Sequence, residues 1–139
     1  MLLDPENLMP QMANILIKAA NGTGDVLYVA ATPSAGDKVA ARWTVPAAHS
    51  KPAMRPTLSI VTSDNGPKTA RTVDIQLNFP IVETVNGVDV VVARVPAKFH
   101  MVLPTNADVS SVKEPAYQIG NLLSAALVRS VFESGYSPT

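Results

Sequence analysis

The sequence contains no cysteine, which excludes disulfide bonds and thiolate metal sites. Its only two histidines, His49 and His100, lie far apart along the chain, so we expect no dedicated site for a transition metal. Runs of eighteen or more apolar residues are missing as well, and we therefore expect no membrane-spanning helix. The first eleven residues are acidic and interrupted by Pro5 and Pro10, unlike a secretory signal peptide.

Sequence patterns typical of catalysis are missing too. The chain has no GxGxxG, P-loop, HExxH or GxSxG pattern. Asp74 and Glu83 could be paired as an acid and a base, but nothing near them in the sequence would raise either pKa. Ser59 with His100 is the kind of pair that any β protein offers. We therefore expect a protein that is not an enzyme, with no catalytic residue, no metal and no cofactor.

The 139 residues carry no net charge, and a hydrophobic content of 47% is ample for the core of one domain. The charges are unevenly distributed, since residues 38–71 hold six basic side chains against the single acid Asp64. A surface with one basic face would suit an RNA backbone. The alternative is that these side chains are scattered over the surface and solvated.

Three Asn-Gly dipeptides, beginning at Asn21, Asn65 and Asn86, separate segments with β propensity. Asn-Gly is the strongest short signal for a hairpin turn, and no connection is long enough for a crossover helix. The sequence therefore predicts antiparallel strands near residues 14–20, 25–31, 38–45, 57–63, 70–79 and 94–103.

Polar and apolar residues alternate strictly in the stretch VDIQLNFP, residues 73–80. Successive side chains of a strand point to opposite faces, so one face is apolar and the other polar. The last strand continues both faces, with Lys98 and His100 on its polar side. The predicted apolar face consists of Val73, Ile75, Leu77, Phe79, Phe99, Met101 and Leu103.

Beyond residue 108 the apolar spacing changes to three and four, which predicts one long or two short helices between 109 and 135. Ser111 with Glu114 has the pattern of a capping box, which would put Pro115 in the first turn. A bend is expected at Gly120, and Gly135 marks the end. The predicted buried stripe of the helices consists of Leu122, Leu123, Leu127, Val131 and Phe132.

Six strands followed by helices predict an α+β fold with the helices segregated to the end of the chain. So little helix cannot cover one face of such a sheet, and a dimer that exchanges helices would supply the missing cover. Trp43, the only tryptophan, is expected to anchor a core or an interface. The polar face either binds single-stranded RNA or is simply solvated, as one face of an antiparallel sheet often is.

Several motifs together resemble the coat proteins of single-stranded RNA bacteriophages, the leviviruses. The resemblance covers roughly residues 12–139 and rests on the order and spacing of the motifs. In chain order they are NGTGDVLYVA, ARW, RTVDIQLNFP, VNGVDV and TNAD, the last of them before a helix.

The resemblance implies an N-terminal β-hairpin, a five-stranded antiparallel sheet and C-terminal helices that interlock with those of a second subunit. Dimers with a continuous ten-stranded sheet would assemble into an icosahedral capsid around genomic RNA. In several members the inner sheet face also binds an RNA hairpin and represses replicase translation. The virion, assembled in the cytoplasm of the bacterial host, would be the location of the protein.

Carried over by position, the RNA face of this family falls on three strands of the chain. Asp74 and Gln76 take positions that help form an adenine pocket in the family, and Lys98 and His100 lie near its stacking tyrosine and asparagine. For the preceding strand, the alternation of polar and apolar residues indicates Thr57 and Ser59. Counting back from Pro80 along the family pattern without gaps indicates Ile60 and Thr62 instead. The candidate RNA-binding residues are Thr57, Ser59, Thr62, Asp74, Gln76, Asn78, Lys98 and His100.

Two departures from the family pattern stand out. Asp74 replaces a neutral group, and the stacking aromatic is missing unless His100 substitutes for it. We expect residues 1–11 to be an N-terminal extension and 12–139 a single domain, with β structure over 12–104 and helix over 109–135. The main alternative is a non-viral β-sheet module that binds single-stranded nucleic acid through the same face.

Overall fold

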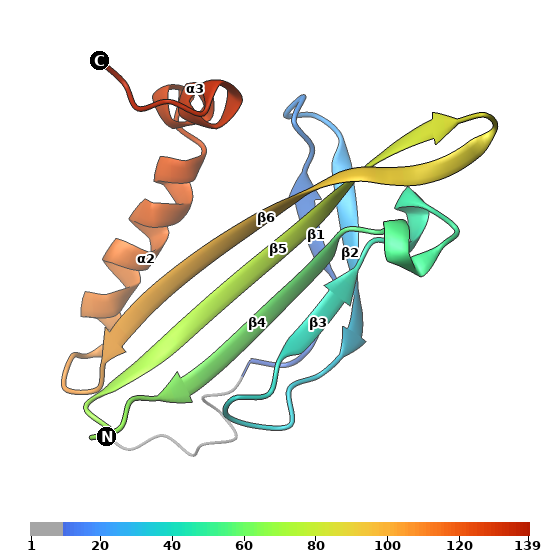
Figure 1. Ribbon diagram of the computed structural model, residues 1–139. Helices are drawn as coiled ribbons and strands as arrows, with labels where there is room; N and C mark the ends of the chain where they lie inside the picture. The colour runs from blue at the N-terminus through green and yellow to red at the C-terminus, as the bar shows by residue number, and fades with distance from the viewer. Residues whose placement is uncertain (1–9) are drawn as a thin grey trace.

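The computed structural model describes residues 10–139, so residues 1–9 of the expected extension lie outside the described part. A long curled antiparallel sheet is followed by two helices (Figure 1). This confirms the predicted α+β class. The N-terminal hairpin is not additional to a five-stranded sheet but forms the first two strands of one six-stranded sheet. In spatial order the strands are β1 (Ile15–Lys18), β2 (Asp25–Thr32), β3 (Ala41–Thr44), β4 (Thr57–Asp64), β5 (Ala70–Val85) and β6 (Val88–Pro104).

The hairpin of β5 and β6 is much longer than the alternation predicted (Figure 1). β5 continues through Pro80, because β4 begins only at Thr57, opposite Asn78, and β5 beyond that point has β6 as its one neighbouring strand. The turn lies at the predicted Asn86-Gly87, where φ is 53° and 79°. Positive φ at both central residues is what a type I′ turn requires.

β3 is shorter than predicted because it begins at Ala41 rather than at residue 38. Lys38 has a φ of 67°, which is incompatible with a strand. Between β3 and β4 the chain forms two short 3₁₀ helices, η1 (Pro46–Ala48) and η2 (Pro52–Met54). This connection contacts β5 and the far half of the long hairpin.

The core lies where the β1–β2 hairpin covers the apolar side of β3 and β4. Trp43 is buried there, and its indole Nε1–H donates to the carbonyl oxygen of Ala13 at 2.8 Å. The predicted role of the tryptophan as an anchor is thereby confirmed. The buried cluster is Tyr28, Trp43, Val45 and Leu58, with Met12, Ile15, Val26, Ala30, Ala41, Ile60, Ile75 and Leu77 packed around it.

The start of the helical region differs from the prediction. α2 (Val109–Leu123) is capped by Asp108, whose carboxylate accepts a hydrogen bond from the Ser111 backbone N–H at 2.9 Å. Hydrogen bonds from Ser111 hold the pKa of the Asp108 carboxyl below its usual range. The predicted capping box of Ser111 and Glu114 is wrong, since Glu114 instead accepts from Gln118 one turn later. Pro115 consequently lies inside the helix and not in its first turn.

The helical region consists of two helices, and the break between them is at Ser124 and Ala125 rather than at Gly120. Gly120 remains within α2. It is exposed and a side chain there would meet no neighbour, so glycine costs the helix only about 1 kcal/mol of propensity at this position. α3 (Ala126–Ser134) ends as predicted at Gly135, with a φ of 79°. No helix in the described part of the chain is long and apolar enough to cross a membrane.

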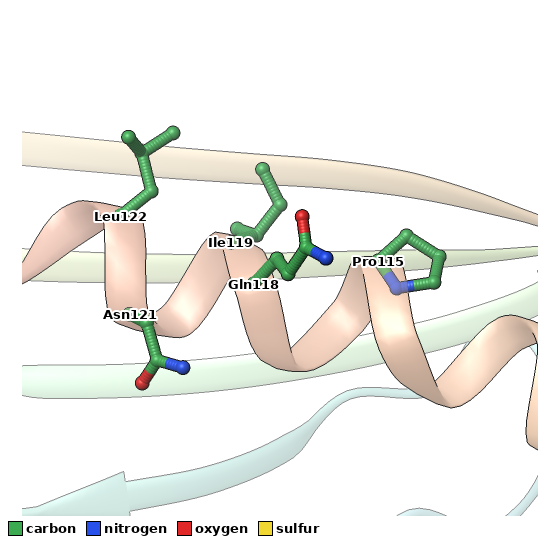
Figure 2. A pocket seen from close by; sticks show the side chains of 5 residues that line it. All are labelled: Pro115, Gln118, Ile119, Asn121 and Leu122. Atoms are coloured by element: carbon green, nitrogen blue, oxygen red, sulfur yellow. The ribbon is translucent and has the colours of Figure 1, made fainter.

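Within the single chain the helices contact each other but do not cover the sheet (Figure 1). The predicted burial of the helix stripe is therefore absent here, with Leu127 62% and Phe132 64% exposed. An open hollow of about 520 Å³ runs along α2, and Figure 2 shows Ile119 and Leu122 on the same side of the helix. The apolar face of β5 and β6 is also incompletely covered, with Phe79 47% exposed.

Candidate nucleic-acid interface

The register of β3 to β6 determines which side chains share a face, because residues directly opposite each other in antiparallel strands point the same way. One row across four strands runs from Arg42 through Ser59 and Gln76 to Lys98. The rows on either side of it place further polar groups on that face. We call the part of this surface that lies alongside β4 the polar face; its polar members are Arg42, Thr44, Thr57, Ser59, Ser63, Thr72, Asp74, Gln76, Asn78, Lys98 and His100.

Seven of the eight predicted RNA-binding residues lie on the polar face, and Thr62 does not. Thr62 is opposite Val73 and therefore belongs to the apolar face, where its hydroxyl lies 3.4 Å from Arg71 Nη2. The gapless count that suggested Thr62 is thus wrong, and the alternation that suggested Thr57 and Ser59 is right. The register depends on the length of the turn between β4 and β5. Counting residues back from Pro80 along the family pattern takes no account of a difference in that length.

Four members of the polar face, Arg42, Thr44, Ser63 and Thr72, were not predicted from the sequence. Arg42 and Thr44 flank Trp43, which is buried on the opposite side of β3. Because the tryptophan was already expected to be an anchor, alternation around it would have placed both neighbours on the polar face.

A shallow hollow of about 310 Å³ opens on the polar face between β2 and β5. Asn78 lies in its wall, and the amide oxygen Oδ1 of Asn78 is buried without a hydrogen-bond partner. An acceptor without a partner costs free energy, so a donor entering the hollow would be stabilised there. Its polar lining residues are Thr32, Arg42, Thr44, Thr57, Ser59, Gln76 and Asn78.

Charge on the polar face is concentrated in four side chains. Asp74 and His100 lie opposite each other on β5 and β6, with carboxylate Oδ1 and imidazole Nδ1 2.5 Å apart. Arg42 and Lys98 are in no salt bridge within the described residues. The face thus presents two cations that are free for anions and one carboxylate that already has a partner.

The basic segment 38–71 does not form a single basic surface. Arg71 points to the apolar face, where it bridges Asp37 at 2.7 Å and Asp64 at 3.0 Å. The Arg71 guanidinium holds the pKa of Asp37 below its usual range. Arg55 donates to backbone carbonyls of the η1–η2 connection instead. The basic side chains of this segment are therefore dispersed and do not form one basic face. Arg42 is the member of the segment that lies on the polar face.

His49 is bonded to the long hairpin. Its Nε2 lies 2.7 Å from Oδ2 of Asp89, whose other oxygen accepts from the Thr84 hydroxyl at 2.6 Å. The hydrogen bond from Thr84 has the larger effect and that with His49 the smaller, and both lower the pKa of Asp89. His49 thus fastens the η1–η2 connection to β6 and lies apart from the polar face.

The candidate catalytic pairs are not assembled. Ser59 is opposite Gln76, whereas His100 is opposite Asp74 and bonded to it. Among the described residues there is no group of three or more His, Asp or Glu side chains suited to a metal ion. The polar face is instead a broad, mostly neutral surface of amides and hydroxyls, groups that bond phosphates and base edges.

No protein-family model matches the sequence, and no curated sequence is recognisably similar to it. Solved structures match it closely in shape at low sequence identity. The virus-like particle of Beihai levi-like virus 21 matches with a TM-score of 0.80 and 17% identity, over 94% of this chain and 99% of that chain. The virus-like particle of bacteriophage NT-214 matches with a TM-score of 0.78 and 16% identity, over 94% and 100%.

The capsid protein of bacteriophage GA matches with a TM-score of 0.68 and 18% identity, over 90% of this chain and 95% of that chain. In each case the match includes almost the whole of both chains. The chain has the fold of the coat proteins of single-stranded RNA bacteriophages.

Proposed function

We propose that this chain is the coat protein of a small RNA phage and that it dimerises and assembles into an icosahedral shell. The single observation that carries the proposal is a pair of uncovered apolar surfaces in a chain with a coat-protein fold. One is the stripe of the helices, with Leu127 and Phe132 more than half exposed, and the other is the apolar face of β5 and β6. Contiguous apolar surfaces that are left uncovered mark interaction sites.

A second copy is the partner that fits both surfaces. β6 is a seventeen-residue strand at the edge of the sheet, with one side of its backbone unpaired in the single chain. Two such edges side by side would continue the sheet across both copies, and each copy would place its helices over the apolar face of the other. Among the described residues only five hydrophobic side chains are buried, so association would cover apolar surface that the folded single chain leaves exposed.

The proposed assembly turns the polar face inward, toward packaged RNA. Arg42 and Lys98 would contact phosphates, and the amides of Gln76 and Asn78 would contact bases or sugars. The contacts are mostly independent of sequence, since the face carries no tyrosine, phenylalanine or tryptophan on which a base would stack. The hollow beside Asn78 is the part suited to a single base, and a repressor role toward one RNA hairpin would depend on it.

Assembly is tested directly by expressing the protein in bacteria, followed by size-exclusion chromatography and electron microscopy. Uniform shells are expected, because dimers are the smallest unit that covers both apolar surfaces. A protein that remains monomeric at every concentration would contradict the proposal. A monomer that still binds RNA would support the non-viral nucleic-acid-binding module instead.

The RNA-binding face is tested by the double variant Lys98→Ala with His100→Ala. We expect the variant to form shells with roughly half of the nuclease-protected RNA or less, because one of two free cations and the imidazole are lost. Lys18→Ala is the matched control, since Lys18 lies on β1, is paired with Asp25 and is absent from the polar face. Equal RNA content in the double variant and the control would mean that another surface holds the RNA.

A further inference from the structure

Asp74 is the only acidic side chain on the polar face, where a carboxylate would repel the phosphates of bound RNA. The structure gives it a specific partner, because Oδ1 of Asp74 is 2.5 Å from Nδ1 of His100 across the strand pair. Both side chains are partly exposed, at 43% for Asp74 and 58% for His100, so RNA on this face would reach them.

The groups around this pair are neutral apart from one lysine. On β6, the same-face neighbours of His100 are Lys98 and Val102, and on β5 those of Asp74 are Thr72 and Gln76. On β4, Val61 is opposite Asp74. β6 is the edge of the sheet, so within the described residues no further strand pairs with it beyond His100. In the proposed dimer, the strand beside it would be β6 of the second copy, carrying the same residues.

We propose that the pair of Asp74 and His100 makes RNA binding by the polar face dependent on pH, with affinity increasing as the pH falls. This inference rests on the proposed RNA-binding function and adds a regulation to it. Histidine is the side chain that gains a proton between about pH 5 and pH 8. With a neutral imidazole, the carboxylate offsets one of the two free cations, Arg42 and Lys98. With an imidazolium, the pair is neutral and both cations act on phosphate undiminished.

The second histidine, His49, allows an effect of His100 on RNA binding to be distinguished from a general effect of low pH. His49 is bonded to Asp89 at the connection between β3 and β4 and is not on the polar face. A change in RNA affinity caused by His100 should therefore survive the loss of His49. A change caused by the hairpin contact should not survive it.

The experiment measures binding of a fluorescently labelled oligouridylate to the purified protein below the concentration at which shells form. The wild type is expected to bind about three- to tenfold more tightly at pH 5.5 than at pH 7.5. The plot of log affinity against log salt should also be steeper at pH 5.5 by about 0.7, the increment for one more phosphate neutralised on a single strand. His100→Gln should remove both differences, and His49→Gln should keep both.

Asp74→Asn, which keeps the size of the side chain, should bind RNA more tightly than the wild type at pH 7.5. A pH response that persists in His100→Gln, or that disappears in His49→Gln, would overturn the inference. Lys98→Ala separates this failure from failure of the proposed function. If Lys98→Ala binds as the wild type does, the polar face is not the RNA site; if it binds more weakly while the response ignores His100, only the pH inference fails.

Discussion

Replacing Leu127 with aspartate is expected to abolish dimers and shells while leaving the single chain folded. Leu127 lies on α3 and is 62% exposed in the single chain, so the substitution disturbs little of the packing within the chain. In the proposed dimer the same side chain is covered by the second copy. Removing a central apolar contact costs about 2 kcal/mol or more, roughly thirtyfold in affinity, and burying a carboxylate without a partner adds to this.

Leu16 provides a matched control for this prediction. It is the same residue type at nearly the same exposure, 63%, but it lies on β1, away from the helices and from the β6 edge. Sedimentation velocity and electron microscopy should show Leu16→Asp forming shells and Leu127→Asp remaining a monomer with an unchanged circular dichroism spectrum. Shells of normal size from Leu127→Asp would rule out the proposed role of α3 in the dimer.

Replacing Trp43 with alanine is expected to produce the largest loss of stability of any single substitution in the β region. Trp43 is only 7% exposed and lies in a small cluster with Tyr28 and Leu58. Truncating a buried tryptophan costs about 3–5 kcal/mol, against a total stability of about 5–15 kcal/mol for a typical domain. We expect little soluble protein and a large decrease in the urea concentration at half-unfolding, followed by circular dichroism.

Trp43→Phe separates packing from hydrogen bonding at the same position. It keeps an aromatic ring in the cluster but leaves the carbonyl of Ala13 without its indole donor. The cost should be about 1–3 kcal/mol for the lost hydrogen bond, with a further contribution from the smaller ring. If Trp43→Ala denatured at the same urea concentration as the wild type, the anchoring role of Trp43 would be refuted.

Local patterns predicted those features of the fold that depend on neighbouring residues. Alternation in residues 73–80 identified the two faces of β5, and Asn86-Gly87 identified the turn of the long hairpin, because side-chain direction and positive φ are local properties. The cap of α2 was misassigned to Ser111 for the same reason. Asp108 and Ser111 both have capping side chains, and the choice between them depended on where the chain leaves β6.

For the candidate site, too, the sequence predicted what depends on local periodicity and missed what depends on how strands pair. The sequence identified Gln76, Asn78, Lys98 and His100 from strand periodicity alone. It misplaced Thr62, because a one-residue difference in register moves a side chain to the opposite face. It did not identify Arg42, which joins the polar face through the pairing of β3 with β4.

By itself, then, the sequence determined that the chain forms antiparallel strands followed by helices, with one apolar and one polar sheet face. Only the tertiary structure decided that Asp74 and His100 form a pair and that Arg71 lies on the far side with Asp37 and Asp64. It also showed that the helices leave the sheet of their own chain uncovered, where the sequence indicated only that they could not cover all of it. Periodicity specifies the direction of a side chain within its own element, whereas its partners depend on register and on how separate elements meet.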